Sequence, residues 1–307
     1  MNKVGAKSAY FIKLGRKGKW EESCIENNTI RLGFQNPLHS VCLNGEWDKV
    51  YDHWISQGKT KGRATQIKNQ IKAFYESDKE TLWITFFKRR MYWCFAEKEV
   101  TQLADETRIR KVKGKWEYVD VQGSPLTLEN LSGKLTKVQG FQGTICSIHE
   151  FDYLIRKLNH QKLPEVEKAE QTLAILLQDI EPLIKNLTWK DFELLVDLIF
   201  THAGWQRINT LGKTEKSLDL DLMSPVTGNR AFVQVKSKAN MSVFEQYRKE
   251  YQGMKDLFDE MYFVVHTTDE FFIGWQDTPD IKLWDVAKLS RLVVNSGLID
   301  WLIKKTS

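Results

Sequence analysis

Short runs of β-branched and aromatic residues, separated by polar stretches, mark the first half of the chain. Such runs predict strands. They lie at 10–15, 30–34, 82–87, 91–95, 115–121 and 141–148. The tripeptide Lys88-Arg89-Arg90 falls between two of these runs and predicts a hairpin turn. Segments 46–57 and 60–75 have helical patterns, so we expect a β-rich first half with inserted helices.

The second half shows a clearer succession of helices and strands. An apolar stripe between residues 173 and 180 predicts a helix of about 20 residues that Pro182 should kink or end. Thr188 and Asp191 resemble a capping box, which opens another helix to about residue 202. Strands are predicted at 205–209, 218–223, 231–236, 261–266 and 281–284, and further helices at 242–258, 286–294 and 298–304. This order predicts a mixed sheet flanked by helices.

The length and the charge distribution both divide the chain in two. A length of 307 residues suits two domains, and the polar segment 159–165 is a natural boundary. We therefore expect a domain at 1–160, a connector helix at 161–187 and a second domain at 188–307. Residues 1–160 hold 27 Lys and Arg against 18 Asp and Glu (+9), and the remainder holds 18 against 22 (−4). A basic half suggests a polyanionic partner.

Composition narrows the class of protein. No apolar run approaches the roughly 18 residues of a membrane-spanning helix, and the first residues lack the apolar core of a secretory signal. We expect a cytoplasmic protein without a membrane partner. The four cysteines, Cys24, Cys42, Cys94 and Cys146, form no C-x-x-C pair, so neither a structural zinc site nor a disulfide framework is expected.

The segment 218–236 carries the strongest chemical signal. Because side chains alternate along a strand, Asp219 and Asp221 share one face of the first strand of a predicted hairpin. Gln234 and Lys236 share one face of the second. Asp221 and the Gln234 side-chain oxygen could bind Mg²⁺, which prefers oxygen ligands, and Lys236 could position or polarise an attacking water. Glu193, on the preceding helix, could reach the same cluster. A solvated hairpin without chemistry is the alternative.

These residues resemble the Mrr-like catalytic domain of the PD-(D/E)xK nuclease superfamily. The resemblance spans roughly 188–302, and strand 262–267 and residues 283–285 take the family's later positions. It implies a restriction-endonuclease-like mixed sheet between helices, and hydrolysis of DNA phosphodiesters that depends on Mg²⁺ (or Mn²⁺). Glu193 matches the helix glutamate, Asp221 the metal-binding aspartate, Gln234 the middle position and Lys236 the lysine. Asp219 could be the family aspartate instead, and the spacing to Gln234 favours Asp221.

The basic half combines aromatic strands with cationic clusters, a composition that suits phosphates and an extruded base. Its layout resembles the PUA-like superfamily of small barrels, which includes readers of modified bases. We predict a PUA-like barrel with helices, in which Trp20 and Trp93 line a base pocket. The predicted DNA-binding cations are Arg16, Lys17, Lys19, Arg89 and Arg90. Core packing of the aromatic residues, or a protein-interaction module, remains the alternative.

Together these observations predict a two-domain fold of the α+β and α/β classes. They predict a target-selective or modification-dependent DNA endonuclease of the type IV restriction kind, whose partner is double-stranded DNA, including DNA with modified bases. One such site cuts one strand, so a double-strand break suggests a homodimer. The alternatives are a non-catalytic nucleic-acid reader and an RNA-directed nuclease.

Overall fold

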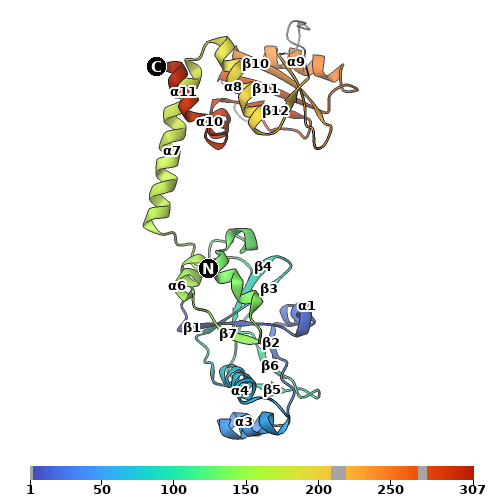
Figure 1. The fold of residues 1–307 in the computed structure, drawn as a ribbon, viewed down its shortest axis with the longest axis vertical. Helices are drawn as coiled ribbons and strands as arrows, with labels where there is room; N and C mark the ends of the chain where they lie inside the picture. Colours follow the sequence, from blue (N-terminus) through green and yellow to red (C-terminus); the bar gives the residue numbers. More distant parts are fainter. Residues whose placement is uncertain (1–2, 209–218, 269–274) are drawn as a thin grey trace. The chain divides into compact units, whose positions relative to one another are not determined.

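The computed structural model describes residues 3–208, 219–268 and 275–307. The chain divides into two compact units, residues 1–163 and residues 164–307, here called the first and the second unit (Figure 1). Within the described ranges, none of the helices has the length and apolar character that crossing a membrane requires.

A four-stranded sheet forms the centre of the first unit. Its order is β4 (Arg90–Phe95), β3 (Thr81–Phe87), β1 (Ser8–Ile12) and β7 (Ile145–Ser147). β1 and β3 run parallel, and the other two pairs are antiparallel. Lys88 and Arg89, between β3 and β4, both have positive φ, 45° and 61°. Two such residues in a two-residue loop suit the right-handed twist of a hairpin, so the predicted turn is confirmed.

A second, three-stranded sheet has the order β2 (Thr29–Leu32), β6 (Arg108–Lys111) and β5 (Thr101–Gln102). The helices of the first unit are α1 (Glu21–Glu26), α2 (His39–Leu43), α3 (Trp47–Ser56), α4 (Lys61–Glu76), α5 (Gly133–Thr136) and α6 (Phe151–Leu158). Short 3₁₀ turns, η1 (Arg16–Gly18), η2 (Leu128–Asn130) and η3 (Lys137–Gly140), complete it. The helices predicted at 46–57 and 60–75 correspond to α3 and α4.

The expected PUA-like barrel is not what the structure has, because the described strands form separate sheets rather than a closed one. The predicted strand 115–121 is the point of difference. Among the described residues, this segment meets the edge of β4 only through the isolated bridge Trp93↔Glu117. Gly114 and Gly123, with φ of 81° and 88°, turn the chain on either side of it. A continuous ladder that could close the sheet therefore does not form here.

Apolar side chains cover both faces of the four-stranded sheet. Along β3, Trp83 belongs to one buried cluster, whereas Leu82 and Ile84 belong to another on the opposite face. Arg108 and Arg110 are also buried in this unit. Arg108 donates to the Asn36 and Phe34 carbonyls, and burial lowers the pKa of Arg110 to about 10. These two cations are internal and do not add to the basic surface.

The second unit contains a five-stranded mixed sheet. Its order is β12 (Ile281–Trp284), β11 (Glu260–Thr268), β10 (Arg230–Ala239), β9 (Leu220–Met223) and β8 (Gln206–Arg207). β10, β11 and β12 are parallel, and β9 and β8 are antiparallel to their neighbours. The predicted mixed sheet is confirmed. Residues 217 and 218, which the sequence placed before Asp219, lie outside the described residues.

Helices cover both faces of this sheet (Figure 1). One apolar cluster joins the sheet to α7 (Pro164–Lys185), α8 (Trp189–His202), α10 (Val286–Asn295) and α11 (Ile299–Thr306). The other joins it to α9 (Met241–Gln252). Pro182 does not end α7 at once: it lies in the last turn of the helix, which continues to Lys185. The Thr188 hydroxyl accepts a hydrogen bond from the Asp191 backbone amide, as the side chain of a helix N-cap does.

Candidate active site

The hairpin of β9 and β10 brings the predicted polar residues together. Asp221 is opposite Phe232 and Leu220 is opposite Val233 in the antiparallel register. Residues directly opposite one another point to the same face, so the two aspartates, Gln234 and Lys236 share the face that Phe232 presents to α9. Val233 and Val235 point into the other core. The alternation read from the sequence is therefore present in the structure.

Asp219 is the centre of this polar group. Its Oδ2 atom accepts hydrogen bonds from the Gln234 side-chain amide and, at 2.7 Å, from the Val235 backbone amide. The Lys236 Nζ atom lies 3.9 Å from the same oxygen. Arg207 of β8 donates to the Asp219 carbonyl at 3.3 Å. The Asp219 carboxylate is thus held by β10 next to an ammonium group.

Asp221 has a different environment. Its Oδ2 atom lies 2.6 Å from the Arg230 guanidinium, which also lies 4.9 Å from the centre of the Phe258 ring. The Asp221 residue is only 9% exposed. The spacing in the sequence favours Asp221 as the metal-binding aspartate, but the structure places Asp219, its alternative, beside Gln234 and Lys236. Asp221 forms an ion pair with Arg230, a residue that the sequence pattern does not single out.

Arg207 and Arg230 are the two residues of this region that the sequence pattern missed. A cation at the start of β10, diagonally across the hairpin from an acid, was the signal for Arg230. Arg207 is exposed on a two-residue strand, and its contact is with a backbone carbonyl, so no sequence pattern points to it. Both arginines fix the position of the aspartate-bearing strand.

Glu193 lies on α8, and its carboxylate is influenced by charges of the same polar group. It follows Phe192, which is fully buried between α8 and the sheet. Burial raises the pKa of Glu193, and the negative charge of Asp219 raises it further, whereas the Lys236 ammonium lowers it. The charges of Asp219 and Lys236 therefore act on the Glu193 carboxylate, although α8 packs on the other face of the sheet, against Val233 and Val235.

Replacing Glu193 with glutamine should stabilise the metal-free protein at neutral pH. A carboxyl whose pKa is raised by folding holds its proton to higher pH in the folded state, so the ionised form costs stability above that pKa. The cost disappears as the pH falls towards the unfolded value of 4.5. Urea unfolding in EDTA should show E193Q above wild type at pH 7.5, with the difference lost near pH 4. A variant less stable at pH 7.5 would contradict this.

The donor set fits a hard divalent cation. The Gln234 side-chain oxygen is buried and has no hydrogen-bond partner among the described residues, and it lies on the residue whose amide binds Asp219. The described residues contain no group of three or more His, Cys, Asp or Glu side chains placed for a metal. Mg²⁺ is usually held by one or two carboxylates together with water, so Asp219, Glu193 and the Gln234 oxygen fit it.

In the first unit, four of the predicted nucleic-acid-binding residues line one cavity. Arg16, Lys17, Lys19 and Trp20 border a cavity of about 530 Å³. Lys19 and Arg31 lie over the Trp20 ring at 4.2 and 4.1 Å from its centre. The cavity lining also includes two cations and two aromatic residues that sequence analysis did not select for it, namely Lys13, Arg63, Phe34 and Phe141.

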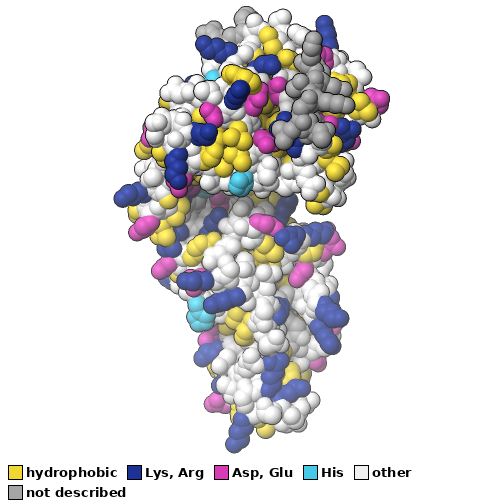
Figure 2. Space-filling view, turned by 45° about the horizontal axis from the view of Figure 1, so that its top comes forward, with side chains coloured by type: hydrophobic (Ala, Val, Ile, Leu, Met, Phe, Trp, Pro, Cys, Tyr) yellow, Lys and Arg dark blue, Asp and Glu magenta, His cyan; other side chains and the backbone are white. Residues whose placement is uncertain are grey.

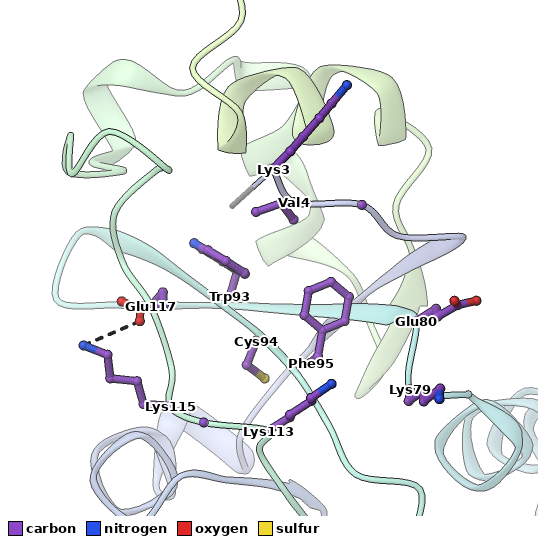
Figure 3. A pocket seen from close by; sticks show the side chains of 12 residues that line it. Lys3, Val4, Lys79, Glu80, Trp93, Cys94, Phe95, Lys113, Lys115 and Glu117 are labelled. Atoms are coloured by element: carbon purple, nitrogen blue, oxygen red, sulfur yellow. Dashed lines mark ion pairs between the residues drawn. The ribbon is translucent and has the colours of Figure 1, made fainter. Parts of the chain in front are cut away.

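Trp93 lines a separate cavity of about 670 Å³ (Figure 3). It is 7% exposed, and its indole N–H donates to the Val119 carbonyl. Arg89 and Arg90 line neither of these two cavities. Arg89 is paired with Glu129, and Arg90 lies over the Tyr118 ring. Lys and Arg side chains are spread over the visible face of this unit, with Asp and Glu between them (Figure 2).

Comparison with known proteins gives one match. Residues 184–293 match the model of a family described as restriction endonuclease (Mrr_cat). No curated protein matches the chain, and neither does any solved structure. The matched range contains Glu193, Asp219, Asp221, Gln234 and Lys236. It confirms the resemblance of this range to an Mrr-like domain and supports a nuclease. The resemblance of the first unit to PUA-like proteins stays a prediction.

Proposed function

We propose that this protein is a Mg²⁺-dependent DNA endonuclease of the PD-(D/E)xK type, whose first unit selects the DNA. One observation carries the proposal: Asp219, Gln234 and Lys236 meet on one face of the β9–β10 hairpin, inside the range that matches a restriction endonuclease family. Glu193 supplies the second carboxylate. The biological role that suits this combination is restriction of foreign DNA with modified bases, in the cytoplasm.

The side chains have separate tasks in this proposal. Gln234 and the Val235 amide hold the Asp219 carboxylate in place. Asp219 and Glu193 would bind Mg²⁺ or Mn²⁺ with the Gln234 oxygen, and such an ion lowers the pKa of a bound water and neutralises phosphate charge. Lys236, beside Asp219, would orient the attacking water and stabilise charge on the phosphate as the P–O3′ bond breaks. The products would carry a 5′-phosphate and a 3′-hydroxyl.

Metal removal tests this proposal directly. The full chain should cut double-stranded DNA when millimolar Mg²⁺ is present, and excess EDTA should stop the reaction because the two carboxylates cannot bind the phosphate unaided. DNA from hosts with different base modifications, assayed beside unmodified DNA on gels, tests target selection. Cleavage that continues in EDTA, or no cleavage of any substrate under any divalent metal, would overturn the proposed activity.

Two other functions remain distinguishable in the same assay. A non-catalytic reader would bind DNA and leave it intact with every metal. An RNA-directed nuclease would cut RNA in preference to DNA when both are offered. The retained acid–amide–lysine cluster favours catalysis over binding alone. Because one site cuts one strand, we expect two copies of the protein to be needed to make a double-strand break. The dependence of the cleavage rate on protein concentration would reveal this.

A further inference from the structure

The pentapeptide Lys-Gly-Lys-Trp-Glu occurs twice in the first unit, at 17–21 and at 113–117. We call these the first and second KGKWE loops. The central glycine has a positive φ in both, 75° at Gly18 and 81° at Gly114. Residues other than glycine rarely adopt this conformation, so each loop turns sharply between its two lysines. The same five residues thus make two tight turns, each with a lysine on either side of its glycine.

The tryptophans anchor both loops to opposite ends of one strand. Trp116 is 4% exposed, and its indole N–H donates to the carbonyl of Thr29, where β2 begins. Trp20 packs against the same apolar cluster, and a Cβ at Gly33, just after β2 ends, would lie 2.9 Å from its ring. Four residues of extended chain span roughly 13 Å, so the anchors of the two loops are about that far apart.

Each loop borders one of the two cavities of the first unit described above. Lys17 and Lys19 line the cavity of about 530 Å³ together with other cations. Lys113 and Lys115 line the cavity of about 670 Å³. Figure 3 shows them on the side of that cavity opposite Val4, with Trp93 and Phe95 between. In both places exposed lysines stand beside an aromatic wall.

The lysine charges are largely uncompensated. Among the ion pairs found in the described ranges, none involves Lys17, Lys19 or Lys113. Lys115 lies 3.5 Å from Glu117, the last residue of its own loop. In the first loop, the Glu21 carboxylate lies against Gly18, 2.5 Å from where a Cβ would be. Each loop therefore holds one carboxylate of its own near a site that suits an anion.

We propose that the two KGKWE loops are paired phosphate-binding turns, which hold the backbone of one nucleic acid at two points. Lysine is a compact point charge suited to phosphate, and phosphate contacts fix position without reading sequence. Successive phosphates of a DNA strand rise 3.4 Å along the axis and also wind around it, so anchors roughly 13 Å apart suit phosphates only a few nucleotides apart on one strand. This inference rests on the proposed function, because it names where the first unit grips its nucleic acid.

Salt dependence of binding tests the inference separately from cleavage. Binding of the full chain to a short DNA duplex is measured in EDTA over a series of salt concentrations. Each lysine that contacts a phosphate of its own contributes about 0.9 to the steepness of the plot of log K against log[salt]. K17A/K19A and K113A/K115A should each make the slope shallower by roughly 1.8, and the quadruple variant by roughly twice that. The matched control K134A/K137A removes two exposed lysines of α5 and η3 and should leave the slope unchanged.

A single-residue change adds a readout that a structural role would not give. E117Q removes the carboxylate that competes with a phosphate for Lys115, so it should tighten DNA binding several-fold without making the slope shallower. An unchanged slope in K113A/K115A would overturn the inference, and so would weaker binding by E117Q. Neither result would touch the proposed nuclease, because Mg²⁺-dependent cleavage by wild type is scored in its own assay.

Discussion

Replacing Asp219 with asparagine should strongly reduce Mg²⁺-dependent DNA cleavage. The Asp219 carboxylate is the one that Gln234 and the Val235 amide hold, with the Lys236 ammonium 3.9 Å away. In our proposal, the substitution removes the charge and one oxygen of a metal-binding carboxylate at the point where charge develops. Metal stabilisation of the transition state is worth several kcal/mol, so the rate should fall roughly a thousandfold. Single-turnover cleavage with saturating enzyme measures this without interference from product release.

The matched variant is Asp221→Asn, two residues along the same strand and on the same face. Its carboxylate pairs with Arg230, so its loss should reduce stability more than chemistry. Removing one partner of a fully buried pair costs about 3–5 kcal/mol. Because the Arg230 side chain is 34% exposed, we expect about 1–2 kcal/mol, measured by urea unfolding. If D221N lost cleavage with an intact fold while D219N retained it, the metal role would return to Asp221.

The contrast between the two aspartates shows what a sequence pattern can decide. Period-two alternation places Asp219 and Asp221 on one face and correctly puts Gln234 and Lys236 beside them. It cannot choose between the aspartates, because a shift of two residues keeps the same face. The choice depends on the strand register, which pairs Asp221 with Phe232. It also depends on Arg230, which forms an ion pair with the Asp221 carboxylate. Neither is visible without the hairpin in three dimensions.

The first unit was harder to predict for a different reason. Several of its elements follow their local patterns, as α3, α4 and the β3–β4 hairpin with positive φ at Lys88 and Arg89 show, whereas β6 has no counterpart among the predicted strands. The way the sheets join does not follow local patterns. Segment 115–121 contains β-forming residues, but with the turn at Gly114 and the anchoring of Trp116 on β2, it forms only an isolated bridge to β4 in the described structure. Closure of a sheet depends on such non-local contacts, and local propensity does not report them.

Trp20 illustrates how packing can change the role of an aromatic residue. The sequence suggests a stacking surface for a base, and the structure does place Trp20 beside a cationic cavity. However, Lys19 and Arg31 lie close over its ring, and the backbone at Gly33 approaches its edge. The ring therefore positions two cations. Trp93 meets Phe95 edge to face and belongs to a buried apolar cluster, so packing accounts for it as well.

Replacing Lys236 with alanine should slow cleavage by about 10²–10⁴-fold while leaving DNA binding nearly unchanged. The Lys236 side chain is one-third exposed, lies beside Asp219 and lies over the Tyr247 ring of α9, so its loss creates little void. A positioned group that transfers or stabilises charge contributes about 10²–10⁴-fold to a rate. The Kd for DNA, set mainly by the first unit in our proposal, should stay within a few-fold of wild type in EDTA. Lys238→Ala is the control, because Lys238 is on the same strand and face but more exposed.

The pH profile distinguishes a catalytic lysine from a structural one. Lys236 lowers the pKa of Glu193, which burial and Asp219 raise. Without Lys236 that pKa rises further, so Glu193 loses its proton only at higher pH, and the residual cleavage by K236A should require a more alkaline buffer than wild type. K236R keeps the charge but replaces a compact ammonium with a planar group, so it should restore the profile more than the rate. Equal losses in K236A and K238A, with no shift in profile, would mean that removing either charge merely disturbs the strand.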